Sequence, residues 1–141
     1  MSQKVALPFL EISQTIRKFP FPPTDWVIGI GRGGIVPASL IAHQLGCHLT
    51  IIQVNYRDDH NQPVHRSPVW FRADLPNLSS DARVLLVDDV SVTGETLKTV
   101  KEKLTEYQVT TFVLKGKADL VAFPDIRTCV DWPWKSINYE I

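Results

Sequence analysis

Two adjacent carboxylates, Asp88 and Asp89, follow the apolar run at residues 84–87 and precede a turn that begins at Thr93. An apolar run of this kind is typical of a buried strand, so both acids are expected at its carboxyl end. Ligands of open parallel sheets bind in the crevice at the carboxyl ends of the strands. A pair of carboxylates there suits the hydroxyl groups of a sugar, or a hydrated magnesium ion on a phosphate ester.

The turn after the acids reads Thr-Gly-Glu-Thr at residues 93–96 and opens a predicted helix. The first N–H groups of a helix have no partners within it and carry a partial positive charge, so a helix start binds anions. Gly94 would let the backbone approach a phosphate closely, and the hydroxyl groups of Thr93 and Thr96 would add donors. Acids and turn together predict a phosphorylated sugar as the ligand. Capping of the helix by Thr93, with Glu95 as a first-turn carboxylate, is the alternative interpretation.

A second glycine-rich turn, Gly-Arg-Gly-Gly at residues 31–34, lies between an apolar strand pattern and an apolar helix pattern. The same physics of a helix start predicts that this turn binds another anion. Arg32 adds a guanidinium group that suits a phosphate contact through two hydrogen bonds. A tight strand-to-helix turn without a ligand is the alternative interpretation.

The elements that position these turns are predicted from hydrophobic periodicity. Strands that alternate with helices predict an α/β domain in which helices cover both faces of a parallel sheet. Residues 57–83 fit no regular pattern, which suggests a functional or mobile loop, although residues 68–73 could form a short strand within it. The predicted strands are residues 26–30, 49–56, 84–89 and 109–117, and the predicted helices are residues 8–19, 35–46 and 93–107.

The composition favours a single cytoplasmic domain. A chain of 141 residues suffices for one core, and its 15 basic and 15 acidic residues give no global field for nucleic acid or an anionic membrane. The amino-terminal stretch lacks the apolar region of a signal peptide, and no apolar run approaches the roughly 20 residues of a membrane span. The two cysteines do not suggest a disulfide framework.

The stretch from Val84 to Leu97 resembles the motif with which type I phosphoribosyltransferases bind phosphoribosyl diphosphate (PRPP): an apolar run, two acids, three variable residues and Thr-Gly-x-Thr. The resemblance implies that Asp88 and Asp89 hold the ribose hydroxyl groups and a Mg²⁺ cofactor, directly or through water. It also implies that the 5′-phosphate is bound by Ser91, Thr93, Gly94, Glu95 and Thr96. The implied fold is a parallel twisted sheet flanked by helices, in one domain of residues 1–141.

Residues 28–46 resemble the pyrophosphate loop and following helix of this family, particularly of the short bacterial xanthine–guanine enzymes. The resemblance implies that Gly31, Arg32, Gly33 and Gly34 bind pyrophosphate. It also implies that Arg32 takes part in catalysis with the acid pair, by neutralising the leaving group. A cis peptide bond between Gly31 and Arg32 is predicted on the same ground.

The irregular segment 57–82 matches the place of the family's mobile lid, and residues 116–141 match a small carboxyl-terminal hood. Closing a lid would exclude water from a reaction that passes through an oxocarbenium-like ribose. Arg57, His65 and Arg66 are candidates to reach pyrophosphate. Their alternative interpretation is that they are solvated loop residues.

The base site is predicted at four residues. By resemblance, Lys115 contacts the 6-oxo group of a purine, and Trp132 or Trp134 stacks on the base while the backbone of residues 130–132 contacts its edge. Core or dimer packing is the alternative for either tryptophan. Val92 departs from the pattern, because 6-oxopurine enzymes usually carry an aspartate there, near purine N7. Valine can neither accept nor give a proton, so the acceptor base stays open.

The predicted function is therefore the transfer of 5-phosphoribosyl from PRPP to a nucleobase, first of all a 6-oxopurine, with release of pyrophosphate. The resemblance further implies a homo-oligomer, either a dimer or a tetramer. Two alternatives remain open because of Val92: a non-catalytic protein that binds PRPP or a nucleotide for regulation, and a transferase with a non-purine acceptor.

Overall fold

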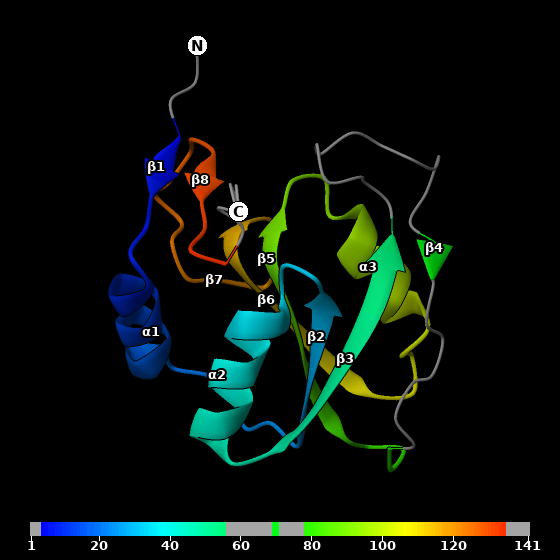
Figure 1. Cartoon of the computed structure of the whole chain (residues 1–141). Coiled ribbons are helices and arrows are strands. Elements are labelled where there is room, and N and C mark those ends of the chain that lie inside the picture. The colour runs from blue at the N-terminus through cyan, green and yellow to red at the C-terminus, as the bar shows by residue number, and fades with distance from the viewer. Residues whose placement is uncertain (1–3, 56–68, 71–77, 135–141) are drawn as a thin grey trace, which may run out of the picture.

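Eight strands and three helices make up the computed structural model, which describes residues 4–55, 69–70 and 78–134 (Figure 1). The strands are β1 Val5–Ala6, β2 Trp26–Gly31, β3 His48–Asn55, β4 Val69–Trp70, β5 Arg83–Ser91, β6 Gln108–Gly116, β7 Leu120–Val121 and β8 Val130–Asp131. The helices are α1 Phe9–Lys18, α2 Ile35–Leu45 and α3 Glu95–Glu102. No helix within the described ranges is long and apolar enough to cross a membrane.

Six strands form the main sheet in the order β4-β3-β2-β5-β6-β7. The strands from β3 to β7 in this order pair in parallel, and only β4 at the edge runs antiparallel to its neighbour. Helices α2 and α3 connect β2 to β3 and β5 to β6, as parallel pairing requires a crossover. The predicted α/β class and parallel sheet are thus confirmed.

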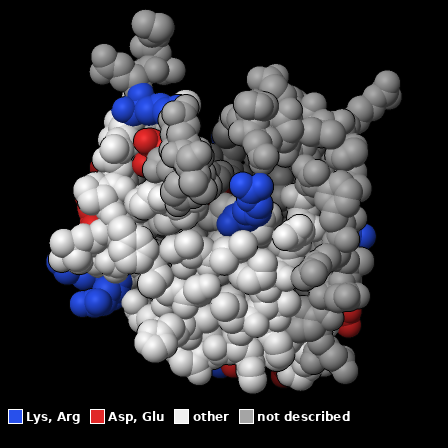
Figure 2. Space-filling view, viewed as in Figure 1, with Lys and Arg blue, Asp and Glu red and all other residues white. Residues whose placement is uncertain are grey.

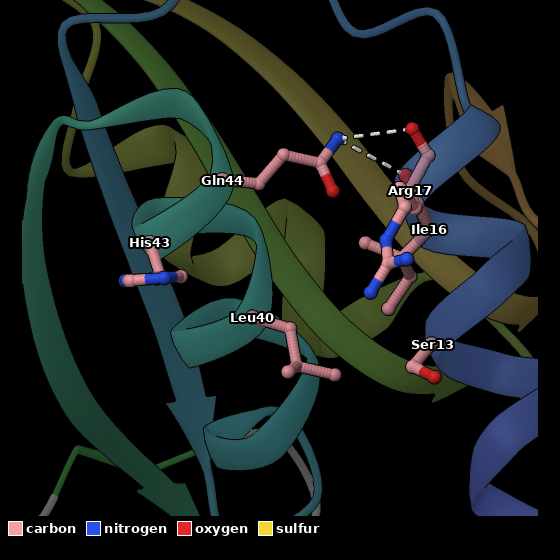
Figure 3. Close-up of a pocket in the computed structure, with 6 residues that line it drawn as sticks. All are labelled: Ser13, Ile16, Arg17, Leu40, His43 and Gln44. Carbon is pink, nitrogen blue, oxygen red and sulfur yellow. Dashed lines mark hydrogen bonds between the residues drawn. The ribbon is translucent and has the colours of Figure 1, made fainter.

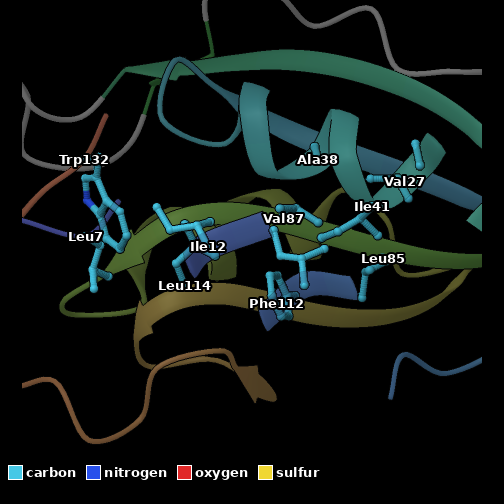
Figure 4. Packing of buried hydrophobic residues seen from close by; sticks show 12 residues of the cluster. Leu7, Ile12, Val27, Ala38, Ile41, Leu85, Val87, Phe112, Leu114 and Trp132 are labelled. Atoms are coloured by element: carbon cyan, nitrogen blue, oxygen red, sulfur yellow. The ribbon is translucent and has the colours of Figure 1, made fainter. Parts of the chain in front are cut away.

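Helices cover both faces of the sheet, and the alternation of side chains along the strands creates two cores. On β5, Leu85 and Val87 face α1 and α2, whereas Val84 and Leu86 face α3. Figure 4 shows the first cluster, in which Val87 and its neighbours meet Ile12 of α1 and Ala38 and Ile41 of α2. The apolar run that predicted a buried strand therefore supplies both cores at once.

An exposed ion pair joins β2 and β5 at their amino ends. Asp25 accepts hydrogen bonds from the Arg83 guanidinium at 2.9 and 2.8 Å and from the Arg83 backbone N–H at 2.9 Å. These bonds hold the pKa of the Asp25 carboxyl well below its ordinary value. Pairing then continues from Trp26 with Val84 to Gly29 with Val87, which aligns the carboxyl ends of both strands.

The chain differs from the sequence-based prediction in several details, among them that β5 runs to Ser91 rather than to residue 89 and that β7 was not predicted. Helix α3 ends at Glu102 rather than at residue 107, because the chain tightens into a turn in which the N–H of Leu104 donates to Lys101 O at 3.0 Å. This turn buries Leu104 under the sheet, with 1% of its surface exposed. The parallel pair β1 and β8, which joins the two ends of the described chain, was not predicted either. Strands of two residues carry no periodicity that a sequence pattern can reveal.

Candidate functional site

The predicted chemical groups converge at the carboxyl edge of the sheet. The turn at residues 31–34 follows β2, the acid pair lies near the end of β5, and Lys115 lies near the end of β6 (Figure 1). Strand β5 is the neighbour of both β2 and β6, and Val90 pairs with Lys115. Residues more than 80 positions apart in the sequence, such as Arg32 and Lys115, are thereby brought to one edge.

The two acids occupy different environments. Asp89 is buried, with 3% of its surface exposed, whereas Asp88 is half-buried. Each carboxylate accepts a hydrogen bond from the next backbone N–H, at 2.8 Å from Asp89 to Asp88 Oδ1 and at 2.7 Å from Val90 to Asp89 Oδ1. These bonds fix both carboxylates against the strand end and so restrict where a ligand can meet them.

Close contact with the glycine turn explains the burial of Asp89. A methyl group added to Gly33 would overlap all three atoms of the Asp89 carboxylate group. A methyl group on Gly34 would lie 2.5 Å from Val87 O and 2.7 Å from Ile30 O, which is closer than real carbon atoms approach. The turn therefore packs directly on β5, and only glycine leaves room for this packing.

The backbone of the turn at residues 31–34 has the predicted conformation. The peptide bond between Gly31 and Arg32 is cis, as predicted. Gly34 N–H donates to Ile30 O at 2.7 Å, which closes the turn before α2 begins. Arg32 is exposed, and Figure 2 shows basic atoms facing the viewer where β2 meets α2. A guanidinium group in this position can contact an anion that arrives from solvent without any change in the backbone of the turn.

The Thr-Gly turn leads from β5 into α3 at the same edge. Thr93 Oγ1 accepts a hydrogen bond from Glu95 N–H at 3.3 Å, but Thr93 precedes the N-cap position and does not cap the helix. Gly94 is the N-cap residue, with a φ of +86°. Thr93 and Glu95 are exposed and Thr96 is half-buried, whereas Ser91 is buried with 7% of its surface exposed. The start of α3 thus lies open beside the acid pair.

Val92 is the most exposed residue among the large apolar side chains near this turn, with 59% of its surface accessible. Burial therefore does not account for an apolar residue at this position. Lys115, by contrast, is half-buried at the end of β6.

The two tryptophans predicted at the base site lie against one another. Their rings stack at a centroid distance of 5.6 Å and an interplanar angle of 8°. Trp132 is 2% exposed and packs with Leu7 in the first core, as Figure 4 shows. This burial favours the packing interpretation for Trp132 over the stacking one. Trp134 is half-buried, and its indole Nε1 finds no hydrogen-bond acceptor within the part of the chain that the structure describes.

Three predicted residues lie outside the described ranges, and one residue of the site was not predicted from the sequence. Arg57, His65 and Arg66 fall in the undescribed stretch 56–68, so their predictions stay as they are. Gly116 was not singled out, although it packs on Ser91 at the base of the Thr-Gly turn. A glycine between two lysines at the end of a strand was the available signal.

A pocket of about 300 Å³ lies elsewhere, between α1 and α2 (Figure 3). Gln44 crosses it and donates to the carbonyl oxygens of Ile16 at 3.2 Å and Arg17 at 3.4 Å. Its lining residues come from the two helices and include none of the predicted site residues; they are Ser13, Ile16, Arg17, Leu40, His43 and Gln44. The pocket is therefore separate from the edge where the predicted groups meet.

The described residues contain no group of three or more histidine, cysteine, aspartate or glutamate side chains that could hold a metal ion. Two carboxylates are nevertheless enough for Mg²⁺ when a phosphate ligand supplies further oxygen atoms, because Mg²⁺ keeps several waters and takes few protein ligands. The carboxylates of Asp88 and Asp89 therefore suit a Mg²⁺ ion that binds together with a phosphate ligand.

Comparisons with known proteins agree with this geometry. A family model described as the phosphoribosyl transferase domain matches residues 12–140. A xanthine-guanine phosphoribosyltransferase from Idiomarina loihiensis is 26% identical over 123 residues, which cover 84% of this chain and 75% of that protein.

Solved structures give the same result for the fold. The chain is similar to a purine phosphoribosyltransferase from Pyrococcus horikoshii, with a TM-score of 0.73, 28% identity and 95% of each chain covered. It is also similar to a xanthine-guanine-hypoxanthine phosphoribosyltransferase from Helicobacter pylori, with a TM-score of 0.70 over 96% of this chain and 95% of that one. The latter is 13% identical, so this likeness concerns the fold alone.

The contact between the glycine turn and Asp89 predicts the effect of Gly33→Ala. The added methyl should displace the carboxylate or the turn, and overpacking of this kind costs about 1–3 kcal/mol of the free energy of unfolding. Urea denaturation measures the loss. Gly31→Ala is the matched control, because its methyl would lie 3.4 Å or more from its nearest neighbours. Equal losses in the two variants would contradict the specific contact with Asp89.

Proposed function

Because the chain belongs to the phosphoribosyltransferase family, we propose that it transfers the 5-phosphoribosyl group of PRPP to a nitrogen of a 6-oxopurine and releases pyrophosphate. The observation that carries this proposal is the packing of the glycine turn on Asp89, four residues before the Thr-Gly turn. Two candidate anion sites thereby flank one acid pair. A sugar with a phosphate group at each end matches this order of groups, and PRPP is such a sugar.

Each turn has its own part in the proposed reaction. The turn at residues 31–34 holds the pyrophosphate, with the Arg32 guanidinium balancing its negative charge. The turn at residues 93–96 and Ser91 hold the 5′-phosphate through N–H and hydroxyl groups. Asp88 and Asp89 accept hydrogen bonds from the ribose hydroxyl groups. Fixing the sugar at three points orients C1 toward the acceptor base, which lowers the entropic part of the barrier.

In the proposed chemical step, the bond between ribose C1 and the pyrophosphate oxygen breaks, and its electron pair leaves with pyrophosphate. A lone pair of the base nitrogen forms the new bond to C1, and the proton of that nitrogen passes to solvent water, because Val92 cannot accept it. Positive charge develops on the ribose in between, and we assign its stabilisation to the carboxylate of Asp89, which is buried. When bound, Mg²⁺ would supply charge neutralisation for the pyrophosphate, held by Asp88 and Asp89.

The assignment of a 6-oxopurine as acceptor is supported by the names of the relatives and by the place of Lys115. An ammonium group at the end of β6, next to Val90 on β5, suits a hydrogen bond to the oxo group of a purine. We assign base stacking to Trp134, with the buried ring of Trp132 as its support from behind. The lid at residues 57–82 and the hood at residues 116–141 stay predictions.

We further propose that the protein forms a homo-oligomer through the face made by α2 and β3. Residues 33–55 contain no lysine, arginine, aspartate or glutamate, and Figure 2 shows an uncharged surface over these elements. Ile35 and Leu49 are 36% and 40% exposed there. In a two-fold interface a patch meets its own copy, so like charges would repel and an uncharged apolar patch suits a second copy of the chain.

The proposed activity predicts pyrophosphate release when the purified protein is mixed with PRPP, MgCl₂ and hypoxanthine, guanine or xanthine. EDTA should abolish release, and Asp89→Asn should lower kcat/KM about 100-fold because the carboxylate charge is lost. Asp81→Asn, which removes an exposed carboxylate before β5, is the matched control and should leave the rate unchanged.

A panel that adds adenine, uracil and orotate separates the alternatives. Turnover with a pyrimidine alone would support the non-purine acceptor. PRPP binding without turnover on any base would support the regulatory, non-catalytic protein, and both results would contradict the proposal.

The exposed position of Val92 predicts that Val92→Asp raises turnover with 6-oxopurines by about tenfold or more, because a carboxylate there can exchange a proton with the base. Steady-state kinetics with hypoxanthine measure the change. Val92→Asn is the matched control, since it has the same shape as aspartate but cannot titrate. If the two variants behave alike, a missing proton acceptor does not limit the wild-type protein.

The oligomer proposal predicts a mass that is two or four times the chain mass of 15.9 kDa in sedimentation equilibrium. Leu49→Lys should shift the mass toward that of the single chain, because a two-fold interface would bring two ammonium groups together. Thr105→Lys, in the turn after α3 on the other face of the sheet, is the control and should leave the mass unchanged. A wild-type protein that sediments as a single chain would contradict the proposal.

A further inference from the structure

The short turn between β6 and β7, residues 116–119, meets the base of the Thr-Gly turn. Gly116 pairs with Ser91, the last residue of β5. Lys117 N–H donates to Ser91 O at 2.8 Å. Ser91 is buried, and the residues directly after it form the turn that leads into α3. Any movement of residues 116–119 is therefore transmitted to the start of the Thr-Gly turn.

Gly116 makes this contact in a way that no other residue type allows. Its φ is +114°, a backbone conformation that side chains of L-residues rarely adopt. A methyl group at this position would overlap Ser91 O and lie 2.8 Å from Ser91 C and 2.9 Å from Ser91 N. Two independent constraints, conformation and space, thus require glycine at residue 116.

The far end of the same turn is held by a pair of reciprocal hydrogen bonds. Asp119 Oδ2 accepts from Thr111 N–H at 3.0 Å, and Asp119 N–H donates to Thr111 Oγ1 at 2.9 Å. Thr111 is buried within β6, with 5% of its surface exposed. Residues 116–119 are therefore fixed to Ser91 at one end and to the middle of β6 at the other.

We propose that Gly116 is a positioning residue, which sets the Thr-Gly turn relative to Lys115 by packing residues 116–119 on Ser91. This inference rests on the proposed function, in which Ser91 and the Thr-Gly turn hold the 5′-phosphate and Lys115 contacts the base. Because Lys115 directly precedes Gly116, the strand that presents the base contact also supports the phosphate turn. The pairing of β5 with β6 then sets the distance between the phosphate site and the base site.

An alanine at residue 116 can relax in two ways, and both disturb the phosphate turn. If φ stays positive, the methyl group pushes Ser91 away. If φ becomes negative, residues 117–119 change direction and the hydrogen bond from Lys117 to Ser91 is lost. The turn at residues 31–34 touches Asp89 instead of Ser91, so it is unaffected in either case.

The test compares the binding of two phosphate ligands by isothermal titration calorimetry. Gly116→Ala should weaken the binding of ribose 5-phosphate about tenfold, because displacement of a binding group by a fraction of an ångström is enough for such a loss. The Kd for free pyrophosphate should not change. A variant that merely destabilises the fold would not produce this split between the two ligands.

Gly46→Ala is the matched control. Gly46 ends α2 in the left-handed region with a φ of +66°, so alanine meets a conformational penalty there as well, but nothing lies within 4 Å of the added methyl. This variant should bind ribose 5-phosphate like the wild type. Gly116→Asn is a second variant with a Cβ, and asparagine visits positive φ more often than alanine does. It should be as impaired as Gly116→Ala.

If Gly116→Ala does not fold, the other end of the turn provides the test. Asp119→Ala removes the side-chain acceptor of Thr111 N–H and loosens that end of the turn, although the backbone N–H of residue 119 can still donate to Thr111 Oγ1. It should weaken ribose 5-phosphate binding without affecting pyrophosphate. Asp119→Asn keeps an acceptor for Thr111 N–H and should restore binding.

The outcomes distinguish this inference from the proposed function. If Gly116→Ala and Asp119→Ala both bind ribose 5-phosphate as tightly as the wild type does, the inference is overturned but the proposed function is not. Failure of the wild-type protein to bind either ligand would overturn the proposed function and the inference with it. Selective loss of ribose 5-phosphate binding in the variants supports both.

Discussion

The packing of the glycine turn on Asp89 is the contact on which the candidate site depends. A carboxylate that is 97% buried needs fixed partners, and here it lies beneath a turn whose Gly33 has no room for a methyl group. The contact joins β2 to β5 at their carboxyl ends. The exposed Asp25–Arg83 ion pair joins the same two strands at the opposite end.

A second close contact has the same physical character. Gly116 meets the backbone of Ser91 on β5, as Gly33 meets Asp89 on that strand. Strand β5 is thus held on one side by the turn after β2 and on the other by the turn after β6. In both cases the absence of a side chain on the glycine lets it approach β5 closely, at the carboxylate of Asp89 for Gly33 and at the backbone of Ser91 for Gly116.

The predictions from sequence succeeded where a local pattern had a direct physical cause. The apolar run before Asp88 predicted a buried strand, and the apolar pattern at residues 35–46 predicted α2, which ends at Leu45. They failed where contacts between residues distant in the sequence determine the local structure. Leu104 turns the chain out of α3 early because its burial outweighs helix propensity. Trp132 is buried against Leu7, a contact that depends on the pairing of β1 with β8.

The sequence by itself determined the α/β class, the family motif and the identity of the acids and glycines, because these follow from local periodicity and residue chemistry. Only the tertiary structure decided that Asp89 is buried while Asp88 is half-buried, and that Gly116 supports Ser91. Such differences arise from contacts between strands that are neighbours in the sheet but distant along the chain. No local pattern encodes them, since two adjacent aspartates look alike until a third segment packs against one of them.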